Sequence, residues 1–376
     1  MKFVCSVCGK TYGADELVIS CSCGGYLKLA FPFQTLKKKD IVTSDHSLWR
    51  YEKALPFPKS EIFASLGEGM TPLVQAKLNG VSLLFKTDYV MPTGSFKDRG
   101  AVMVINYLKK HGAARIVNDS SGNAAASYAG YCAVAELACD IFVPADTSDG
   151  KLTQIEMYGA RVTKVPGTRD DVTIAAKKAA EESKGTAIYA NHSWHPLFLQ
   201  GTKTLAYEIW EQMGWDVPDN VIVPFGGGSS LIGLYYGFSE LLSAGEITNI
   251  PRLYAIQSQN CNPLYAIYIG KEDSAQCLPT LAEGLALAKP VKRYEACDIV
   301  RKTKGAVEVV SEEEIVTGLR LAAKVGFYVE PTTAVAIAGT IRLLQNKVIQ
   351  ADEKTVVLLT GSGLKATDKI ASVMKS

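Results

Sequence analysis

From about residue 66 onward, short runs of β-branched residues alternate with longer stretches of helical pattern. The strand-like runs are 81–86, 114–117, 140–143, 161–165, 221–223, 253–257 and 356–359. The helical stretches lie near 97–111, 122–135, 150–158 and 170–184. Strands that alternate with helices of about ten to fifteen residues are typical of parallel α/β sheets, which bind ligands at the carboxyl ends of their strands. We therefore expect a parallel α/β fold.

The length and charge of the chain limit its organisation and its partners. At 376 residues the chain is too long for one ordinary core, so two domains and an appendage are expected. The formal net charge is only +2, and the one conspicuous basic run, 37–39, predicts a solvated linker. We expect no nucleic-acid partner. No stretch approaches the length needed to cross a bilayer and no signal peptide is visible, so no membrane partner is expected either.

Four of the nine cysteines gather within residues 1–30 as two short pairs. The first pair is Cys5-x-x-Cys8 and the second is Cys21-x-Cys23, each followed by glycine. Two pairs on a hairpin-sized segment predict a zinc ribbon with a closed, structural site. The alternative is a surface hairpin with two reduced pairs. The odd number of cysteines suits a reducing cytosol better than a disulfide framework, and we expect a cytoplasmic protein.

Three loops that follow predicted strands have compositions suited to ligand binding. The sequence Phe-Gly-Gly-Gly-Ser-Ser-Leu at 225–231 lets backbone N–H groups converge on a phosphate at a helix start, although a simple strand–helix turn is the alternative. It fits neither a nucleotide P-loop nor a dinucleotide fingerprint. In the segment 119–127, Asn123 is either a ligand or a helix cap. The third loop, 358–365, contains Thr360.

A lysine in an unusual setting completes the pattern. Lys97 lies in a Gly/Ser loop, 92–100, that leads into an apolar helical stretch. A lysine that forms an imine must be held near a carbonyl group and be able to lose its proton, which partial burial favours. Lys97 is therefore a candidate for covalent catalysis.

Together these segments resemble the fold type II enzymes that depend on pyridoxal 5'-phosphate (PLP), and within them the threonine synthase family. The matching segments run from about Trp49 to the C-terminus and are 49–51, 66–73, 92–100, 121–123, 201–204, 329–331 and 360–365. The resemblance implies a zinc-ribbon-like segment at 1–30, a large PLP-binding α/β domain of 31–89 plus 190–376, and a small α/β domain of 90–189. It also implies a homodimer with a small amino-acid substrate.

The resemblance implies a role for each matching residue. Lys97 would hold PLP as a Schiff base and move protons at the substrate carbons. Asn123 would donate a hydrogen bond to the phenolic oxygen of PLP, and the Thr360 hydroxyl would face the pyridine nitrogen. The phosphate of PLP would be bound by Gly226, Gly227, Gly228, Ser229 and Ser230. The expected substrate-binding residues are Ser95, Ser120, Ser121, Gly122, Ser193 and His195.

Three of the four positions with which the better-known members bind the phosphate of O-phosphohomoserine differ in this chain, and only the serine is kept. Those members use a threonine, an asparagine, a serine and an arginine. The matching residues here are Ala124, Gly227, Ser193 and Phe198. Possible replacements are Arg169, His192, His195 and Lys203, and the alternative is that the histidines are plain loop residues and Arg169 a surface residue.

Three functions therefore remain open from the sequence. The first is threonine synthase, which converts O-phospho-L-homoserine and water to L-threonine and phosphate. The second is a related serine/threonine dehydratase or β-replacement enzyme, whose substrate carries no phosphate. The third is a non-catalytic protein that binds PLP or an amino acid, which an intact Lys97 disfavours.

Overall fold

The computed structural model describes residues 1–30 and 35–375. It contains two compact units. Unit 1 comprises the described parts of Met1–Gln34, Asp40–Glu68 and Lys97–Thr202, and unit 2 comprises Thr35–Lys39, Gly69–Phe96 and the described part of Lys203–Ser376. The domain bounds expected from the sequence, 31–89 plus 190–376 and 90–189, stay a prediction, and residues 31–34 lie outside the described part of the chain.

Unit 1 begins with a small antiparallel sheet in the order β2-β1-β3. Its strands are β1 (Lys2–Cys5), β2 (Thr11–Gly13) and β3 (Leu27–Leu29). The segment is attached to the rest of unit 1 by apolar contact, because the ring of Phe3 packs edge-on against Tyr107 with 5.9 Å between the centroids. The first thirty residues thus form a hairpin-like sheet that carries the four cysteines.

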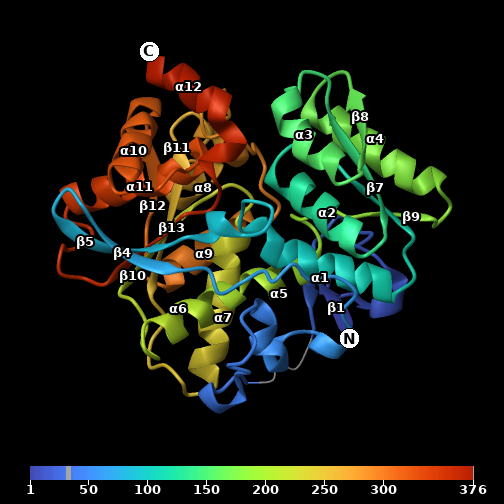
Figure 1. Cartoon of the computed structure of the whole chain (residues 1–376), viewed down its shortest axis with the longest axis horizontal. Coiled ribbons are helices and arrows are strands. Elements are labelled where there is room, and N and C mark those ends of the chain that lie inside the picture. The colour runs from blue at the N-terminus through green and yellow to red at the C-terminus, as the bar shows by residue number, and fades with distance from the viewer. Residues whose placement is uncertain (31–34, 376) are drawn as a thin grey trace. The chain divides into compact units, whose positions relative to one another are not determined.

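The remainder of unit 1 is built on a parallel four-stranded sheet in the order β8-β7-β6-β9 (Figure 1). Its strands are β6 (Arg115–Asn118), β7 (Ala138–Pro144), β8 (Arg161–Val165) and β9 (Ala187–Tyr189). Its helices are α1 (Lys97–Lys110), α2 (Asn123–Val134), α3 (Asp149–Met157), α4 (Arg169–Glu182) and α5 (Pro196–Thr202). Helices α1 and α5 approach closely, since a Cβ on Gly201 would overlap with the carbonyl oxygen of Arg99.

Unit 2 is built on a six-stranded sheet in the order β12-β11-β10-β13-β5-β4. Its strands are β4 (Leu73–Leu78), β5 (Val81–Lys86), β10 (Asn220–Pro224), β11 (Arg252–Ser258), β12 (Val307–Val310) and β13 (Thr355–Leu358). Its helices are α6 (Thr204–Gln212), α7 (Ser229–Ser243), α8 (Pro263–Tyr268), α9 (Arg293–Lys302), α10 (Glu312–Lys324), α11 (Pro331–Gln345) and α12 (Thr367–Lys375). All neighbouring strands are parallel except β4 and β5, and α10 packs beside α11 (Figure 1).

The expected parallel α/β fold is confirmed. Each strand-like run named above is a strand, and each helical stretch named above is a helix. Three strands, β4, β9 and β12, are not predicted by the sequence pattern, and all three lie at the edge of a sheet. An edge strand has a neighbour on one side only, so its residues are less uniformly apolar; β4, for example, is mostly exposed or half-buried. Among the described residues, no helix is long and apolar enough to span a membrane.

A buried ion pair joins the sheet of unit 2 to helix α6. Lys86 at the end of β5 and Glu208 in α6 are both inaccessible, and Lys86 Nζ lies 2.7 Å from Glu208 Oε2. The same ammonium group donates to the carbonyl oxygen of Thr71 at 2.5 Å and to Gln212 Oε1 at 3.0 Å. These three acceptors compensate for the water that the buried ammonium group has lost.

We expect Glu208→Gln to lower the free energy of unfolding by about 3–5 kcal/mol, because it leaves the buried charge of Lys86 without its carboxylate. The matched control is Asp216→Asn, which removes one partner of the exposed Lys354–Asp216 pair and should leave stability nearly unchanged. Denaturant unfolding of the two variants measures the difference. Equal effects would show that the buried pair is no more important than an exposed one.

Candidate active site and metal centre

Two loops of the candidate site meet at one edge of the sheet of unit 2. Strands β10 and β13 are parallel neighbours, with Ile222 opposite Val357, so their carboxyl ends lie side by side. The glycine loop 226–228 follows β10 and leads directly into α7. Thr360 follows β13. Parallel pairing therefore brings together two predicted segments that are more than a hundred residues apart in the sequence.

The glycine loop has a shape that only glycine allows at two positions. A Cβ on Gly226 would lie 2.8 Å from the carbonyl oxygen of Gly284. Gly228 has a φ of 84°, in the left-handed region, and a Cβ there would lie 3.0 Å from the ring of Phe225. Ser229 and Ser230 then open α7, whose first backbone N–H groups have no partner within the helix. The loop thus presents backbone donors with no side chain in the way.

The Thr360 side chain is held by a threonine that the sequence motifs do not identify. Thr333 Oγ1 lies 3.0 Å from Thr360 Oγ1, accepts a hydrogen bond from Gly361 N at 2.8 Å and donates to Gly361 O at 3.1 Å. The carboxylate of Glu330 occupies the space that a Cβ on Gly361 would need. A hydroxyl in a helical stretch is too common a pattern to single out Thr333 from the sequence.

The chain just before Lys97 pairs with the loop that contains Thr360. Ser95 forms a β-bridge with Gly361, and Phe96 N donates to Thr360 O at 2.9 Å. The hydroxyl of Ser95 is fully buried and has no hydrogen-bond partner within the described chain. Such a group is free to bond a ligand, as expected of a predicted substrate-binding residue.

Within unit 1, Lys97 and Asn123 are the first residues of α1 and α2. A buried hydrogen bond ties these two helix starts together, because Ser127 Oγ donates to Asp98 Oδ1 at 2.5 Å. Asp98 follows Lys97 directly, and Ser127 lies about one helical turn after Asn123. The structure therefore brings the predicted lysine and asparagine to neighbouring helix ends.

The predicted substrate residues of unit 1 lie on two neighbouring loops. Ser120, Ser121 and Gly122 follow β6, while Ser193 and His195 follow β9, the parallel neighbour of β6. Asn191 Nδ2 links the loops by donating to Asp119 Oδ1 at 2.7 Å. These residues are thus on adjacent strand ends, as parallel pairing requires.

The cationic residues considered for a substrate phosphate have varied surroundings. His195 is buried, its Nδ1 accepts from Leu197 N at 3.3 Å, and its ring is 5.4 Å from that of Tyr107. Lys203, in unit 2, is fully buried 2.9 Å from Glu240, and burial lowers its pKa. Arg169 is exposed at the start of α4.

An aromatic residue lies beside Lys97 where better-known family members have an arginine. Phe198 is fully buried, and its ring centroid is 5.7 Å from Lys97 Nζ. It packs so closely on α1 that a Cβ on Gly100 would overlap with the ring. His192 lies against the same ring at 5.7 Å between centroids. Phe198 thus places an apolar ring beside the polar groups of Lys97 and His192.

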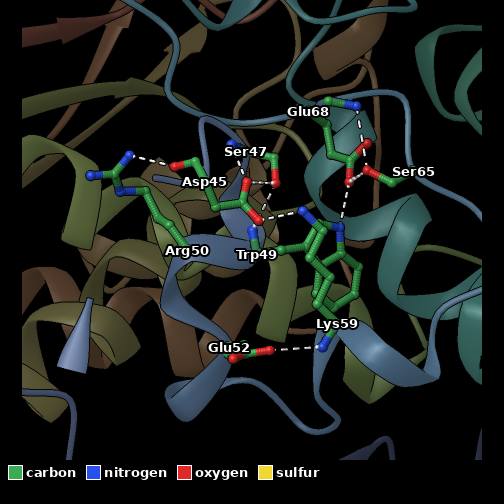
Figure 2. Close-up of polar contacts among 9 residues, drawn as sticks. Asp45, Ser47, Trp49, Arg50, Glu52, Lys59, Ser65 and Glu68 are labelled. Atoms are coloured by element: carbon green, nitrogen blue, oxygen red, sulfur yellow. Dashed lines mark hydrogen bonds and ion pairs between the residues drawn. The ribbon is translucent and has the colours of Figure 1, made fainter. Parts of the chain in front are cut away.

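The segment 49–51 and the start of the segment 66–73 meet around a buried carboxylate in unit 1 (Figure 2). Glu68 Oε1 accepts from Trp49 Nε1 at 2.9 Å and from Ser65 Oγ at 3.0 Å. Its other oxygen accepts from Leu66 N at 2.7 Å and from Tyr131 OH at 2.9 Å. Four donors satisfy the buried charge. Glu68 thereby links Trp49 and the residues just before Glu68 in sequence to Tyr131 in α2.

The four N-terminal cysteines form a cluster suited to a metal ion. The Sγ atoms of Cys5, Cys8, Cys21 and Cys23 all lie within 4.8 Å of one another, and three of the separations are 3.5 Å. Tetrahedral zinc with Zn–S bonds of about 2.3 Å requires sulfur separations of roughly 3.8 Å. The cluster therefore nearly matches the geometry of a closed site with four cysteine ligands.

Hydrogen bonds to the sulfur atoms favour thiolates, the form that binds metal. Val7 N and Cys8 N lie 3.4 and 3.5 Å from Cys5 Sγ, and Tyr12 OH donates to Cys21 Sγ at 3.0 Å. The backbone N–H of Cys23 and the Tyr12 hydroxyl lower the pKa of Cys21 to about 6. A hydrogen bond from the Gly25 backbone lowers the pKa of Cys23, but contacts with the sulfur atoms of Cys21, Cys5 and Cys8 outweigh it and raise that pKa to about 12.

We expect the purified protein to contain one zinc ion per chain and Cys8→Ser to lose it. Removing a ligand should weaken zinc binding by more than the roughly 10–100-fold that loss of an outer partner costs. Metal analysis and a zinc-chelation titration measure this. Cys277→Ser, far from the cluster in sequence, is the control and should keep its zinc. Equal zinc content in all three proteins would contradict the assignment.

Comparison with known proteins identifies the family. Residues 64–361 match the family described as pyridoxal-phosphate dependent enzymes. A threonine synthase of Methanocaldococcus jannaschii is 35% identical over 380 residues, covering 97% of this chain and 93% of the relative. The chain belongs to the threonine synthase family. A second member, from Methanosarcina acetivorans, is 31% identical and covers 98% of this chain and 93% of its own.

Solved structures agree on the fold. An L-serine ammonia-lyase from Rhizomucor miehei has a TM-score of 0.70 and 20% identity, covering 82% of this chain and 98% of the other. At that identity the likeness establishes the fold alone, and the expected fold type II architecture is confirmed. As a member of the threonine synthase family, the chain is a PLP-dependent lyase.

The residues present fit PLP. Its phosphate group needs several backbone N–H donors that no side chain blocks. The loop of Gly226 and Gly228 at the start of α7 supplies them. The buried Ser95 hydroxyl also lacks a partner that a bound molecule would provide.

Proposed function

We propose that this protein is a threonine synthase, which converts O-phospho-L-homoserine and water to L-threonine and phosphate. The observation that carries the proposal is the similarity to curated threonine synthases over nearly the whole chain, at 35% and 31% identity for the two archaeal relatives. The intact Lys97 and glycine loop argue against a non-catalytic protein, because a chain that had lost PLP chemistry would have no need of either.

Each part of the cofactor has a residue suited to it. Lys97 Nζ would hold PLP covalently, and Asn123 would bond its phenolic oxygen. Thr360 would face the ring nitrogen with a hydroxyl, which does not hold that nitrogen protonated as a carboxylate would. The phosphate would be bound by Gly226, Gly227, Gly228, Ser229 and Ser230. When bound, the cofactor withdraws electrons from the carbons of the attached amino acid.

The protein's own groups would then orient the substrate and move its protons. The helix start at Gly122–Asn123, with Ser120 and Ser121, would bind the substrate carboxylate, because backbone N–H groups and the helix dipole favour an anion. Lys97 Nζ would take protons from the substrate carbons and return them. In sum, phosphate leaves the γ-carbon, a proton lost from the β-carbon is balanced by one gained at the γ-carbon, the hydroxyl of water joins the β-carbon, and the remaining water proton goes to the released phosphate. Ser95, Ser193 and His195 would complete the binding site.

Lys97→Ala should reduce kcat by several orders of magnitude, because the variant lacks the group that moves each proton. It should also lose the visible absorption of covalently bound PLP. The control is Lys110→Ala at the far end of α1, an exposed lysine paired with Glu61. The control should keep both properties. A Lys97→Ala variant with ordinary turnover would contradict the assignment.

A second candidate is favoured by the apolar side chain of Phe198 beside Lys97. A phosphate dianion is normally held by charge-assisted bonds to arginine or lysine, whereas Phe198 offers none and Ala124 is buried without a polar group. A serine/threonine dehydratase or β-replacement enzyme acts on a substrate without phosphate and needs no arginine or lysine to bind the leaving group. The residue that lies beside Lys97 Nζ therefore suits a neutral leaving group better.

Product analysis separates the two functions. With O-phospho-L-homoserine, we expect equal amounts of threonine and free phosphate, with little 2-oxobutyrate. Serine and threonine serve as the alternative substrates. Ammonia and an oxoacid from either amino acid, with phosphohomoserine inert, would contradict threonine synthase and support the second candidate.

We also propose that the protein is a cytoplasmic homodimer, as its resemblance to the family implies. Four of the nine cysteines form a cluster with metal-ligand spacing, which suits a reducing compartment better than a disulfide framework does. Light scattering coupled to size-exclusion chromatography measures the oligomeric state, and a monomer at micromolar concentration would contradict the dimer.

A further inference from the structure

Two cysteines in unit 2, distinct from the metal cluster, lie almost at bonding distance. Cys261 Sγ and Cys277 Sγ are 2.7 Å apart. Cys261 is fully buried and Cys277 is exposed. A disulfide bond requires about 2.05 Å between the sulfur atoms, so small side-chain rotations are sufficient to close it.

The backbone around the pair has the geometry that a disulfide needs. Asn262 N donates to Gln276 O at 3.0 Å, and Leu278 N donates to Asn260 O at 2.7 Å. In an antiparallel bridge this pattern makes the two cysteines a non-hydrogen-bonded pair, with Cα atoms typically about 4.5 Å apart. Disulfides tolerate Cα separations of roughly 4.4–6.8 Å, so the bond requires no backbone movement.

We propose that Cys261 and Cys277 form a reversible disulfide that ties the segment 278–285 down beside the glycine loop. The disulfide would join the two ends of the segment 262–276, which contains α8 (Pro263–Tyr268). The significance for cofactor binding rests on the proposed role of the glycine loop, whereas the disulfide itself does not.

The segment that follows Cys277 leads directly to the glycine loop. Thr280 Oγ1 and Leu281 N both donate to the carboxylate of Glu312 at 2.7 Å. A few residues later, the carbonyl oxygen of Gly284 lies where it would be 2.8 Å from a Cβ on Gly226. Movement of the segment 278–285 would therefore shift Gly284 and Leu285, the residues against which Gly226 packs.

The exposure of the two thiols determines the order of the reaction. The Cys277 thiolate attacks one sulfur of glutathione disulfide, forms a mixed disulfide and releases one glutathione thiolate. Cys261 then loses its proton to solvent and attacks the Cys277 sulfur, which displaces the second glutathione. The two cysteines lose two electrons, and one glutathione disulfide becomes two glutathione thiols. Burial raises the pKa of Cys261 to about 12, so the exposed Cys277 reacts first.

The test is equilibration of the holoenzyme with glutathione buffers of increasing oxidation, followed by alkylation and peptide mapping. We expect a peptide in which Cys261 is joined to Cys277, which disappears again on reduction. Cys277→Ser should abolish it. The matched control, Cys297→Ala, removes another buried thiol of the same unit and should leave the joined peptide unchanged.

Two results of the mapping would overturn the disulfide. In one, both cysteines alkylate fully at every glutathione ratio. In the other, Cys277 carries glutathione while Cys261 remains a thiol. Neither result depends on turnover, so a failure here is distinguishable from a failure of the proposed threonine synthase activity.

Hydrogen exchange tests the coupling to the glycine loop. We expect amides in 278–285 to exchange at least about 10-fold more slowly in the oxidised than in the reduced protein, because a closed loop restricts local opening. Amides of β6 in unit 1 are the internal reference. Unchanged exchange in 278–285 after complete oxidation would show that the bond does not act on this segment.

Discussion

The backbone pairing between residues 94–96 and 360–362 fixes the loops at one edge of the sheet of unit 2. Phe96 N donates to Thr360 O at 2.9 Å, Ser362 N donates to Gly94 O at 3.0 Å, and Ser95 bridges Gly361. These bonds hold the chain at the carboxyl end of β13, and Lys97 is the next residue. Since β5, β13 and β10 are adjacent parallel strands, the segments that follow all three leave the same edge of the sheet.

The elements were predictable where strands are largely buried, as β10, β11 and β13 are, and where helices show their own period. The order of the strands in the sheets was not predictable, because the periodicity of a sequence carries no information on which strands pair. Thus Thr360 and the glycine loop could be recognised as motifs, but their adjacency follows only from the pairing of β13 with β10. The edge strands β9 and β12 are only three and four residues long, too short for a clear sequence pattern, and β4 is mostly exposed or half-buried.

The parts of the site that sequence reasoning missed are those held by ordinary residues. Thr333 positions Thr360 and Gly361 through one hydroxyl, yet it stands in a helical stretch with other threonines. Cys261 and Cys277 are sixteen residues apart with no motif around them, so only the bridge between their backbones shows that they form a pair. By contrast, the N-terminal cysteines have short spacings that predict a cluster.

The chemistry of the site divides into a part that the family shares and a part that this chain has altered. Lys97, Asn123 and the glycine loop are the residues that we propose to hold PLP. Near Lys97 lies the buried ring of Phe198, at a position where the resemblance to the family implies a phosphate-binding arginine. The leaving group is therefore the main question of specificity, because many reactions share the fold and the fold does not select among them.

The central claim, that Lys97 holds the cofactor, is tested most directly by trapping the linkage. Treating the PLP-loaded protein with borohydride makes the bond between lysine and cofactor permanent, and peptide mapping by mass spectrometry then locates it. The account predicts a pyridoxyl group on Lys97 and on no other lysine. A modified lysine elsewhere, or full occupancy by PLP with Lys97 unmodified, would contradict it.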